Sequence, residues 1–509
     1  MRKFLLFLLL TLSGLVLKAQ TSIPTFISDS LDNYISEGIK DWDIPGLAIA
    51  IVKDGKTVMM KGFGVKDLQT KEPVDENTLF MIASNSKLFT GTALAKLEFE
   101  KRLSLDDKVT KYFPDYRLYD SNSTALVSIR DLLCHRIGTK TFQGDFVFWN
   151  SSLGRKEIMK KMSLLKPIYP FRQQYGYCNS CFMTAGEIIP KVTGQPWEVY
   201  VYDSIIIPLG MMNTHTLTQG ISQRSNVAKP YTNAYTGKLT EMPFDNVDNI
   251  GAAASIVSNV KDLSKWLMMQ LDSGRYEGKR IFPWEVLQKT RDINIITRSR
   301  KSTVYPMHFQ GYGLGIFSAD YNGRQVFWHT GGADGYVTNT CFVPEENLGI
   351  TILTNNDNQS FFELLRYQIL DAYLGVGYTN RSKSNLSVYK KNLNDEANVT
   401  QALNKRVKEN KPPLSLDRYT GTFINEIYGD IEITQQQGLN DLIIKFKGNN
   451  NLLGKLQYMD NEEWLLSYNI LGYGIFPVKF TASKKELTIR LKVNDFIDYD
   501  YYVFAKYEK

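Results

Sequence analysis

Metal-ligating residues are scarce in this 509-residue sequence, which contains four cysteines and four histidines. No two histidines stand close together, whereas zinc sites typically draw ligands from short local spacings. Cys178 and Cys181 form a C-x-x-C, but they lack the strand-to-helix setting of a redox motif, so we interpret both as incidental. Four cysteines permit disulfides in an exported chain without requiring them. The sequence therefore predicts no metal ion and no cofactor.

Neither sign of charge dominates, because 60 lysine and arginine residues stand against 53 aspartate and glutamate residues, a formal net charge of +7. Three of the basic residues, Arg2, Lys3 and Lys18, lie at the N-terminus. The others are spread out, apart from Arg298-Ser299-Arg300-Lys301 and a polar segment near residue 400, and such clusters are most often solvated surface. The charge pattern gives no indication of nucleic-acid binding.

Apolar runs long enough to span a membrane are also absent. The apolar segment Phe4–Leu17 is shorter than the roughly 20 residues that a spanning helix needs. It follows Met1-Arg2-Lys3 and precedes Lys18-Ala19-Gln20, the order of a cleavable signal peptide over residues 1–19. A retained membrane anchor is the alternative. We therefore expect a periplasmic or secreted protein with no integral membrane segment after cleavage.

The segment Ser84-Asn85-Ser86-Lys87 places a lysine one helical turn after a serine, so both side chains share a helix face. A serine hydroxyl is a weak nucleophile, and a partly desolvated amine can accept its proton. Unlike the same spacing elsewhere in the chain, this pair opens a strongly apolar segment, residues 88–97. Taken alone, it is equally compatible with an N-cap serine and a solvated lysine. The same spacing occurs at Ser163/Lys166, Ser258/Lys261 and Ser387/Lys390.

Two further elements follow in order, Tyr177-Cys178-Asn179 and His329-Thr330-Gly331-Gly332. Y-x-N also occurs at Tyr231 and Tyr378, so the order of the elements carries the argument. With Ser84 they resemble the class C beta-lactamase and D,D-peptidase-like serine hydrolase family, a likeness that runs from about Ile44 to about Leu374. It also includes Ile44-Pro45-Gly46, Leu132-Leu133-Cys134-His135-Arg136-Ile137-Gly138, Pro208-Leu209-Gly210-Met211 and Tyr312-Gly313-Leu314-Gly315.

The resemblance implies a catalytic set. Ser84 would be the acylated nucleophile, Lys87 its activating amine and Tyr177 the general base and acid. The backbone N–H groups of Ser84 and Gly332 would form the oxyanion hole that acyl transfer needs. A tyrosine with a pKa near 10 can act as a base only if a cationic neighbour favours its phenolate. Lys87 could supply that charge.

The resemblance also implies that Asn179, His329, Thr330 and Gly331 bind the substrate, with Asn179 donating to the substrate amide. His329 stands where many relatives carry the lysine of K-T-G, and H-T-G is frequent in the esterase and D-aminopeptidase-like branches. A histidine holds a carboxylate only below its pKa, which is about 6.5 when unperturbed. We therefore expect peptides or esters to be better substrates than beta-lactams, and carboxylate binding to weaken as the pH rises.

Patterning predicts an α+β chain, and its 43% hydrophobic residues suffice for a large core and a second domain. Leu47–Phe63 carries a hairpin signal at Asp54-Gly55. We expect an antiparallel sheet flanked by helices, with a helical subdomain between about Leu88 and Trp266. Together these form a beta-lactamase/transpeptidase-like domain over residues 20–377.

Residues 378–414 form a polar linker that reads as an exposed helix over Asn385–Lys411, ended by Pro412-Pro413. Residues 415–509 read as eight short strands, which predicts a small all-β barrel. Its opening, Leu416–Phe423, resembles the lipocalin-like C-terminal domain found behind some of these hydrolases. Ligand binding is one role for such a barrel, and packing or oligomerisation is the simpler one.

The resulting hypothesis is an exported serine hydrolase that cleaves an amide or ester bond, plausibly in a D-amino-acid-containing peptide, through an acyl-enzyme on Ser84. A beta-lactamase is one alternative, and a non-catalytic scaffold with the penicillin-binding fold is another. The expected partner is a small peptide, ester or beta-lactam-like substrate. Assembly as a homo-oligomer is compatible with the sequence.

Overall fold

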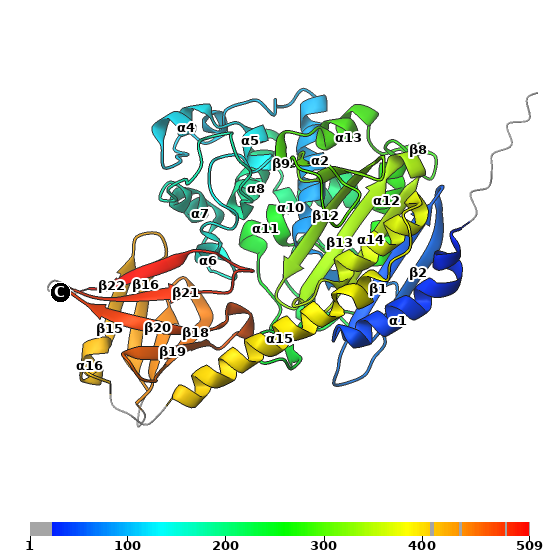
Figure 1. The fold of residues 1–509 in the computed structure, drawn as a ribbon. Helices are drawn as coiled ribbons and strands as arrows, with labels where there is room; N and C mark the ends of the chain where they lie inside the picture. Colours follow the sequence, from blue (N-terminus) through cyan, green and yellow to red (C-terminus); the bar gives the residue numbers. More distant parts are fainter. Residues whose placement is uncertain (1–22, 408–411, 437–439, 484–485, 508–509) are drawn as a thin grey trace, which may run out of the picture.

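The computed structural model describes residues 23–407, 412–436, 440–483 and 486–507. The predicted signal peptide, residues 1–19, lies outside the described residues. Figure 1 shows a domain of sheet and helices joined by the long helix α15 (Arg381–Arg406) to a separate barrel. The predicted α+β organisation with a small all-β barrel after the main domain is confirmed.

An eight-stranded sheet forms the centre of the first domain, in the order β2-β1-β14-β13-β12-β11-β10-β9, and every neighbouring pair is antiparallel. Strands β1, β13 and β14 are buried almost throughout because helices cover both faces of the sheet. The strands are β1 Gly46–Lys53, β2 Lys56–Gly64, β9 Ile295–Arg298, β10 Gln310–Tyr312, β11 Phe317–Tyr321, β12 Arg324–Ala333, β13 Tyr336–Val343 and β14 Leu348–Thr354.

The alternation of side chains along β1 divides the interior into two hydrophobic cores. The smaller core lies under α1 (Leu31–Asp41) and α14 (Phe361–Leu374), and the larger lies under α12 (Val260–Leu271). Helix α2 (Ser86–Phe99) belongs to the larger core and is buried on nearly all sides, as its apolar sequence predicts. The larger core continues into the helical subdomain, so α2 lies between the sheet and that subdomain.

The helical subdomain consists of short helices and loops, as expected. Its helices are α3 Val109–Tyr112, α4 Ser121–Leu126, α5 Ile129–Leu133, α6 Asp145–Phe148, α7 Arg155–Met162, α8 Asn179–Gly186, α9 Ile188–Thr193, α10 Trp197–Val201 and α11 Gly251–Ala254. The remaining short elements are β3 Phe80–Met81, β4 Tyr231–Thr232, β5 Thr240–Glu241, β6 Val257–Ser258, β7 Arg275–Tyr276, β8 Lys279–Arg280, α13 Trp284–Arg291 and α16 Leu416–Tyr419.

The linker helix α15 is anchored to the first domain at its N-terminal half. Asn380 caps it by accepting from the Lys383 backbone N–H at 3.0 Å. Trp42 donates to Ser382 Oγ at 2.9 Å and stacks on Tyr389, with ring centroids 4.6 Å apart. The helix thus begins four residues earlier than the sequence pattern indicated, because these contacts extend it toward α14.

Eight strands close the C-terminal barrel in sequence order. They are β15 Gly421–Asn425, β16 Gly429–Gln435, β17 Leu442–Phe446, β18 Asn449–Tyr458, β19 Glu463–Tyr468, β20 Ile475–Ala482, β21 Leu487–Lys492 and β22 Tyr501–Lys506. No helix among the described residues is long and apolar enough to cross a bilayer.

An aromatic side chain of the first domain packs against aromatic residues of the barrel domain. The ring of Phe146, in α6, contacts the rings of Tyr428, Phe446, Tyr473 and Tyr502, with centroids 4.7 to 6.2 Å apart. Such contacts between aromatic rings stabilise the fold beyond the effect of the apolar area that they bury. This contact supports the packing role of the barrel, while ligand binding inside it stays a prediction.

Candidate active site

Ser84 lies in a tight turn between β3 and α2. The turn is a single 3-10 segment, Ala83–Asn85, and Ala83 has a φ of +45°, a left-handed conformation that costs a non-glycine residue free energy. Ile82 donates to the Ile256 carbonyl at 3.0 Å and fixes the start of the turn. The expected start of a buried helix is therefore present, with Ser84 half-buried immediately before it.

The ammonium group of Lys87 is fully buried and has three partners. Nζ lies 3.0 Å from Ser84 Oγ, 2.7 Å from Asn179 Oδ1 and 2.9 Å from the Ala253 carbonyl oxygen. Burial lowers the pKa of Lys87 well below its usual value, although the charges of Asp145 and Cys178 oppose this. Once deprotonated, the amine can donate its two protons to the amide and carbonyl oxygens and accept the proton of the Ser84 hydroxyl.

Asn179 positions Lys87 rather than standing open to the substrate. Its Oδ1 accepts from Lys87, and its Nδ2 donates to Asp145 Oδ2 at 2.5 Å. The expected donation to a substrate amide is left to the second Nδ2 hydrogen. Asp145 is itself buried, and burial followed by the charge of Asp498 raises its pKa well above the usual value.

Tyr177 covers the amine of Lys87. Nζ lies 4.6 Å from the centre of its ring, and the ring packs on His135 with centroids 4.3 Å apart. Within the described part of the chain, the Tyr177 hydroxyl has no hydrogen-bond partner of ordinary geometry. Burial raises its pKa strongly, and Ser84 lowers it only in part. Because burial raises the pKa of Tyr177 and lowers that of Lys87, Lys87 is the better first base, with Tyr177 suited to relay the proton.

His329 differs from the sequence-based expectation. Its Nδ1–H donates to the Thr330 carbonyl at 2.5 Å, so Nε2 accepts from the Tyr312 hydroxyl at 2.9 Å. Burial, followed by the charge of Lys87, lowers its pKa to about 3. The expected weakening of carboxylate binding as the pH rises assumed an unperturbed pKa near 6.5, which this burial and these two hydrogen bonds do not favour. The role of His329 in substrate binding stays a prediction.

The strand β12 brings Thr330, Gly331 and Gly332 beside the nucleophile turn. A Cβ on Gly331 would overlap the Ile82 carbonyl oxygen and lie 2.6 Å from Thr338 Oγ1, so only glycine permits this approach. Ser84 and Gly332 are both half-buried, and Thr330 is half-buried beside them. The oxyanion hole formed by the N–H groups of Ser84 and Gly332 stays a prediction.

The barrel contributes a loop to this site. A Cβ on Gly332 would lie 2.8 Å from Cε2 of Phe496, which belongs to the loop between β21 and β22. Asp498 of the same loop accepts from the backbone N–H groups of Gly144 and Phe146 at 3.1 and 3.3 Å. The loop therefore reaches both strand β12 and the α6 segment that holds Asp145.

A cavity of about 320 Å³ lies between the end of β12 and this loop. Its walls combine aromatic rings with carboxyl groups. They include Phe142, Phe496, Tyr499, Asp334, Asp357 and Asp495. Burial raises the pKa of Asp334 well above its usual value and that of Asp357 to about 6, which favours their neutral forms. Such a lining suits an apolar or hydrogen-bonding substituent.

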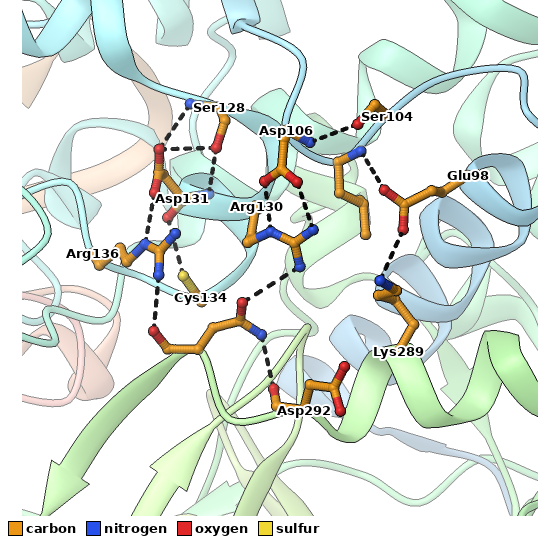
Figure 2. A network of polar contacts seen from close by, with 12 residues as sticks. Glu98, Ser104, Asp106, Ser128, Arg130, Asp131, Cys134, Arg136, Lys289 and Asp292 are labelled. Atoms are coloured by element: carbon orange, nitrogen blue, oxygen red, sulfur yellow. Dashed lines mark hydrogen bonds and ion pairs between the residues drawn. The ribbon is translucent and has the colours of Figure 1, made fainter.

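Figure 2 shows ion pairs that hold the turn carrying His135. Fully buried Asp131, in α5, accepts from Ser128 at 2.9 Å and from Arg136 Nε at 2.6 Å. Arg172, which lies five residues before Tyr177 in the sequence, forms an ion pair with Asp131 at 2.7 Å. Although burial raises the pKa of Asp131, these partners hold it below the usual value. Asp131 thus ties the His135 turn to the Tyr177 segment.

The C-x-x-C also lies in the site. Cys178 immediately precedes α8 and Cys181 is in its first turn, with the two Sγ atoms 2.6 Å apart and both thiols free. The preceding segment is a loop rather than a strand, as the sequence indicated. The interpretation of both residues as incidental does not account for their contact.

Sequence reasoning missed Asp145, the Ala253 carbonyl and the barrel loop. Asp145 stands 34 residues before its partner Asn179 and no spacing marks it. The small residues of Gly251–Ala254 were the available signal for a backbone segment packed closely on α2. The barrel loop carried no signal, because its contact depends on how the two domains dock.

The Beta-lactamase family model matches residues 31–374, so the chain belongs to this family. It is 25% identical to "Protein flp" of Staphylococcus aureus (strain N315) over 354 residues, 68% of this chain and 67% of that protein. It is 26% identical to "Unguisins hydrolase ungD'" of Aspergillus campestris over 440 residues, 81% of this chain and 79% of that protein.

Among solved structures, the octameric penicillin-binding protein homologue from Pyrococcus abyssi matches with a TM-score of 0.60 and 21% identity, over 94% of this chain and 99% of that one. This likeness shows the shared fold. The beta-lactamase and penicillin-binding-protein resemblance inferred from the sequence is thus confirmed, while its class C detail and the lipocalin likeness stay predictions.

Proposed function

We propose that this chain is an exported serine hydrolase that cleaves an amide or ester bond through an acyl-enzyme on Ser84. The contact of Ser84 Oγ with the desolvated amine of Lys87, at 3.0 Å, carries the proposal. A lysine that only stabilises the fold would not be expected in the interior without a carboxylate bonded to it, because removing its charge from water costs free energy. Because burial lowers its pKa, the amine there is a suitable base for the serine proton.

In the first step, Ser84 Oγ attacks the substrate carbonyl carbon while its proton passes to Lys87 Nζ. The carbonyl π electrons move to oxygen, and the N–H groups of Ser84 and Gly332 are proposed to bind that oxyanion. The Lys87 ammonium then returns the proton, relayed by the Tyr177 hydroxyl, to the departing amine or alcohol. Water enters in the second step, loses a proton along the same route and releases the acid from Ser84.

The surroundings favour peptides or esters over beta-lactams. Beta-lactam antibiotics present a carboxylate near the bond that is cleaved, and neutral His329 offers it no charge. A peptide or ester without a carboxylate at that position suits the site better. The name of the related unguisins hydrolases supports a hydrolase.

The test is a substrate panel of D-amino-acid peptides, short-chain esters and a chromogenic cephalosporin, run on the wild type and on Ser84→Ala. We expect peptide or ester turnover that Ser84→Ala abolishes while its thermal unfolding midpoint stays the same. A cephalosporin that is the best substrate at pH 8 would favour the beta-lactamase alternative instead. Folded wild-type protein without turnover of any panel member, and without acylation by an ester, would favour the scaffold alternative.

Export and assembly are parts of the same proposal. Export rests on the predicted signal peptide over residues 1–19, and N-terminal sequencing of the secreted protein should find Gln20 first. The octameric state named for the Pyrococcus abyssi homologue supports a homo-oligomer here. Light scattering during gel filtration would decide between that state and a monomer, which after cleavage is lighter than the 58.2 kDa of the 509-residue chain.

A further inference from the structure

We infer that Cys178 and Cys181 are a reversible dithiol–disulfide site built into the catalytic centre. Cys178 stands between Tyr177 and Asn179, and its backbone N–H donates to His135 Nδ1 at 3.0 Å. Its Sγ lies 2.6 Å from Sγ of Cys181. Both thiols are buried, at 2% and 0% exposure, so the packing around them holds the two sulfur atoms in contact.

The backbone permits the bond. Cys178 is the N-cap of α8 and Cys181 follows one turn later, so the two side chains share a face. A disulfide requires Cα atoms about 4.4 to 6.8 Å apart and a sulfur–sulfur bond of about 2.05 Å. The sulfur atoms, 2.6 Å apart, need to approach by only roughly 0.6 Å to reach that bond length.

The two thiols differ as an attacking and a resolving pair should. Burial raises the pKa of Cys178, but hydrogen bonds from Cys181 and Ser180 and the charge of Lys87 bring it below the usual value. Burial and the neighbouring Cys178 raise the pKa of Cys181 well above its usual value. Cys178 is therefore the more readily deprotonated thiol and attacks first, and Cys181 is the thiol that completes the bond.

The oxidant is a small-molecule disulfide of the glutathione class. The Cys178 thiolate attacks one sulfur of that disulfide, forms a mixed disulfide and releases one thiolate. Cys181 then loses its proton, attacks the Cys178 sulfur and releases the second thiol. The two cysteine sulfurs together lose two electrons, which reduce the glutathione disulfide to two thiols. Because Cys178 is only 2% exposed, exchange occurs on local opening or before the site is buried during folding.

Oxidation changes the environment of Lys87. The negative charge on Cys178 is one of the two that raise the pKa of Lys87, and a disulfide removes it. The other titratable groups around this amine are Asp145, Tyr177, His135 and His329, and oxidation leaves them covalently unchanged. The oxidised enzyme should therefore keep its free amine to lower pH, and the acid limb of kcat/KM should move to lower pH.

The experiment refolds the full chain in glutathione buffers of increasing oxidised fraction, then alkylates it in denaturant. We expect two of the four cysteines to escape alkylation. Peptide mapping should find a disulfide-linked peptide that joins Cys178 to Cys181 and that dithiothreitol separates by reduction. Cys341→Ala, distant on β13, should still form the linked peptide, and Cys181→Ser should not. Four alkylated cysteines at every ratio, or a disulfide joining any other pair, would overturn the site.

The effect on catalysis has a separate readout. The pH profile of kcat/KM is measured on the linked and the dithiothreitol-reduced protein. Reduced Cys181→Ser is the matched control for the loss of one sulfur. An acid limb at lower pH only in the linked form supports the effect on Lys87. Identical limbs in linked and reduced protein would overturn it, whatever the substrate proves to be.

Discussion

Replacing Gly331 by alanine tests whether β12 holds the nucleophile turn. The added Cβ would overlap the Ile82 carbonyl oxygen and lie 2.6 Å from Thr338 Oγ1. Since ordinary contact begins at 3.4 Å, the threonine alone demands a shift of about 0.8 Å, and the carbonyl demands more. That carbonyl also accepts from Thr338 and Asn85, which fix the turn at 3.1 and 3.2 Å.

We expect Gly331→Ala to lower kcat/KM by about 10²-fold, because a misplacement near 1 Å has that cost in catalysis. Overpacking should lower the free energy of unfolding by about 1 to 3 kcal/mol. The assays are ester hydrolysis and urea unfolding. Gly377→Ala is the matched control, since no described atom lies within 4 Å of its Cβ position and its φ is ordinary. Ester hydrolysis by Gly331→Ala within threefold of the wild type would refute the reasoning.

Four further outcomes follow from the geometry. Tyr177→Phe should reduce turnover about 10²-fold without altering the unfolding midpoint, and full activity would exclude a proton relay through Tyr177. The ratio of cephalosporin to ester kcat/KM should stay constant from pH 5.5 to 8.5, because His329, with a pKa of about 3, is neutral throughout; a falling ratio would restore a protonated histidine. Asp131→Asn should lose about 3 kcal/mol of stability at pH 7. Because the folded-state pKa of Asp131 is depressed, this loss should shrink as the pH falls below about 4, as urea unfolding at several pH values would detect. Phe146→Ala should cost about 3 to 5 kcal/mol, measured by the same unfolding, and a near-neutral result would mean that the barrel docks without it.

The strands were the part of the fold that the sequence predicted best. The eight barrel strands and the hairpin of β1 and β2 alternate apolar and polar residues or flank a turn, and both signals are local. Helix α15 was predicted with a later start, because its first turn depends on contacts with Trp42 that no local pattern encodes.

The catalytic residues were accessible from motif order, whereas their protonation was not. The order of the motifs predicted that Ser84, Lys87 and Tyr177 act together, and in the structure Lys87 contacts both of the others. The neutral state of His329 follows from its complete burial and from a hydrogen bond to Tyr312, and neither is visible in H-T-G. Asp145 was missed for the same reason, since its role exists only where α6 meets α8.

Acylation of Ser84 by a fluorophosphonate is the measurement that tests the central claim most directly. Intact mass and peptide mapping should find one adduct, on Ser84, and none on Ser84→Ala of the same thermal stability. The labelling rate should rise with pH as the Lys87 amine loses its proton, and Lys87→Met should lower it at every pH. An adduct on Ser163, Ser258 or Ser387, or no adduct on folded protein, would contradict the account.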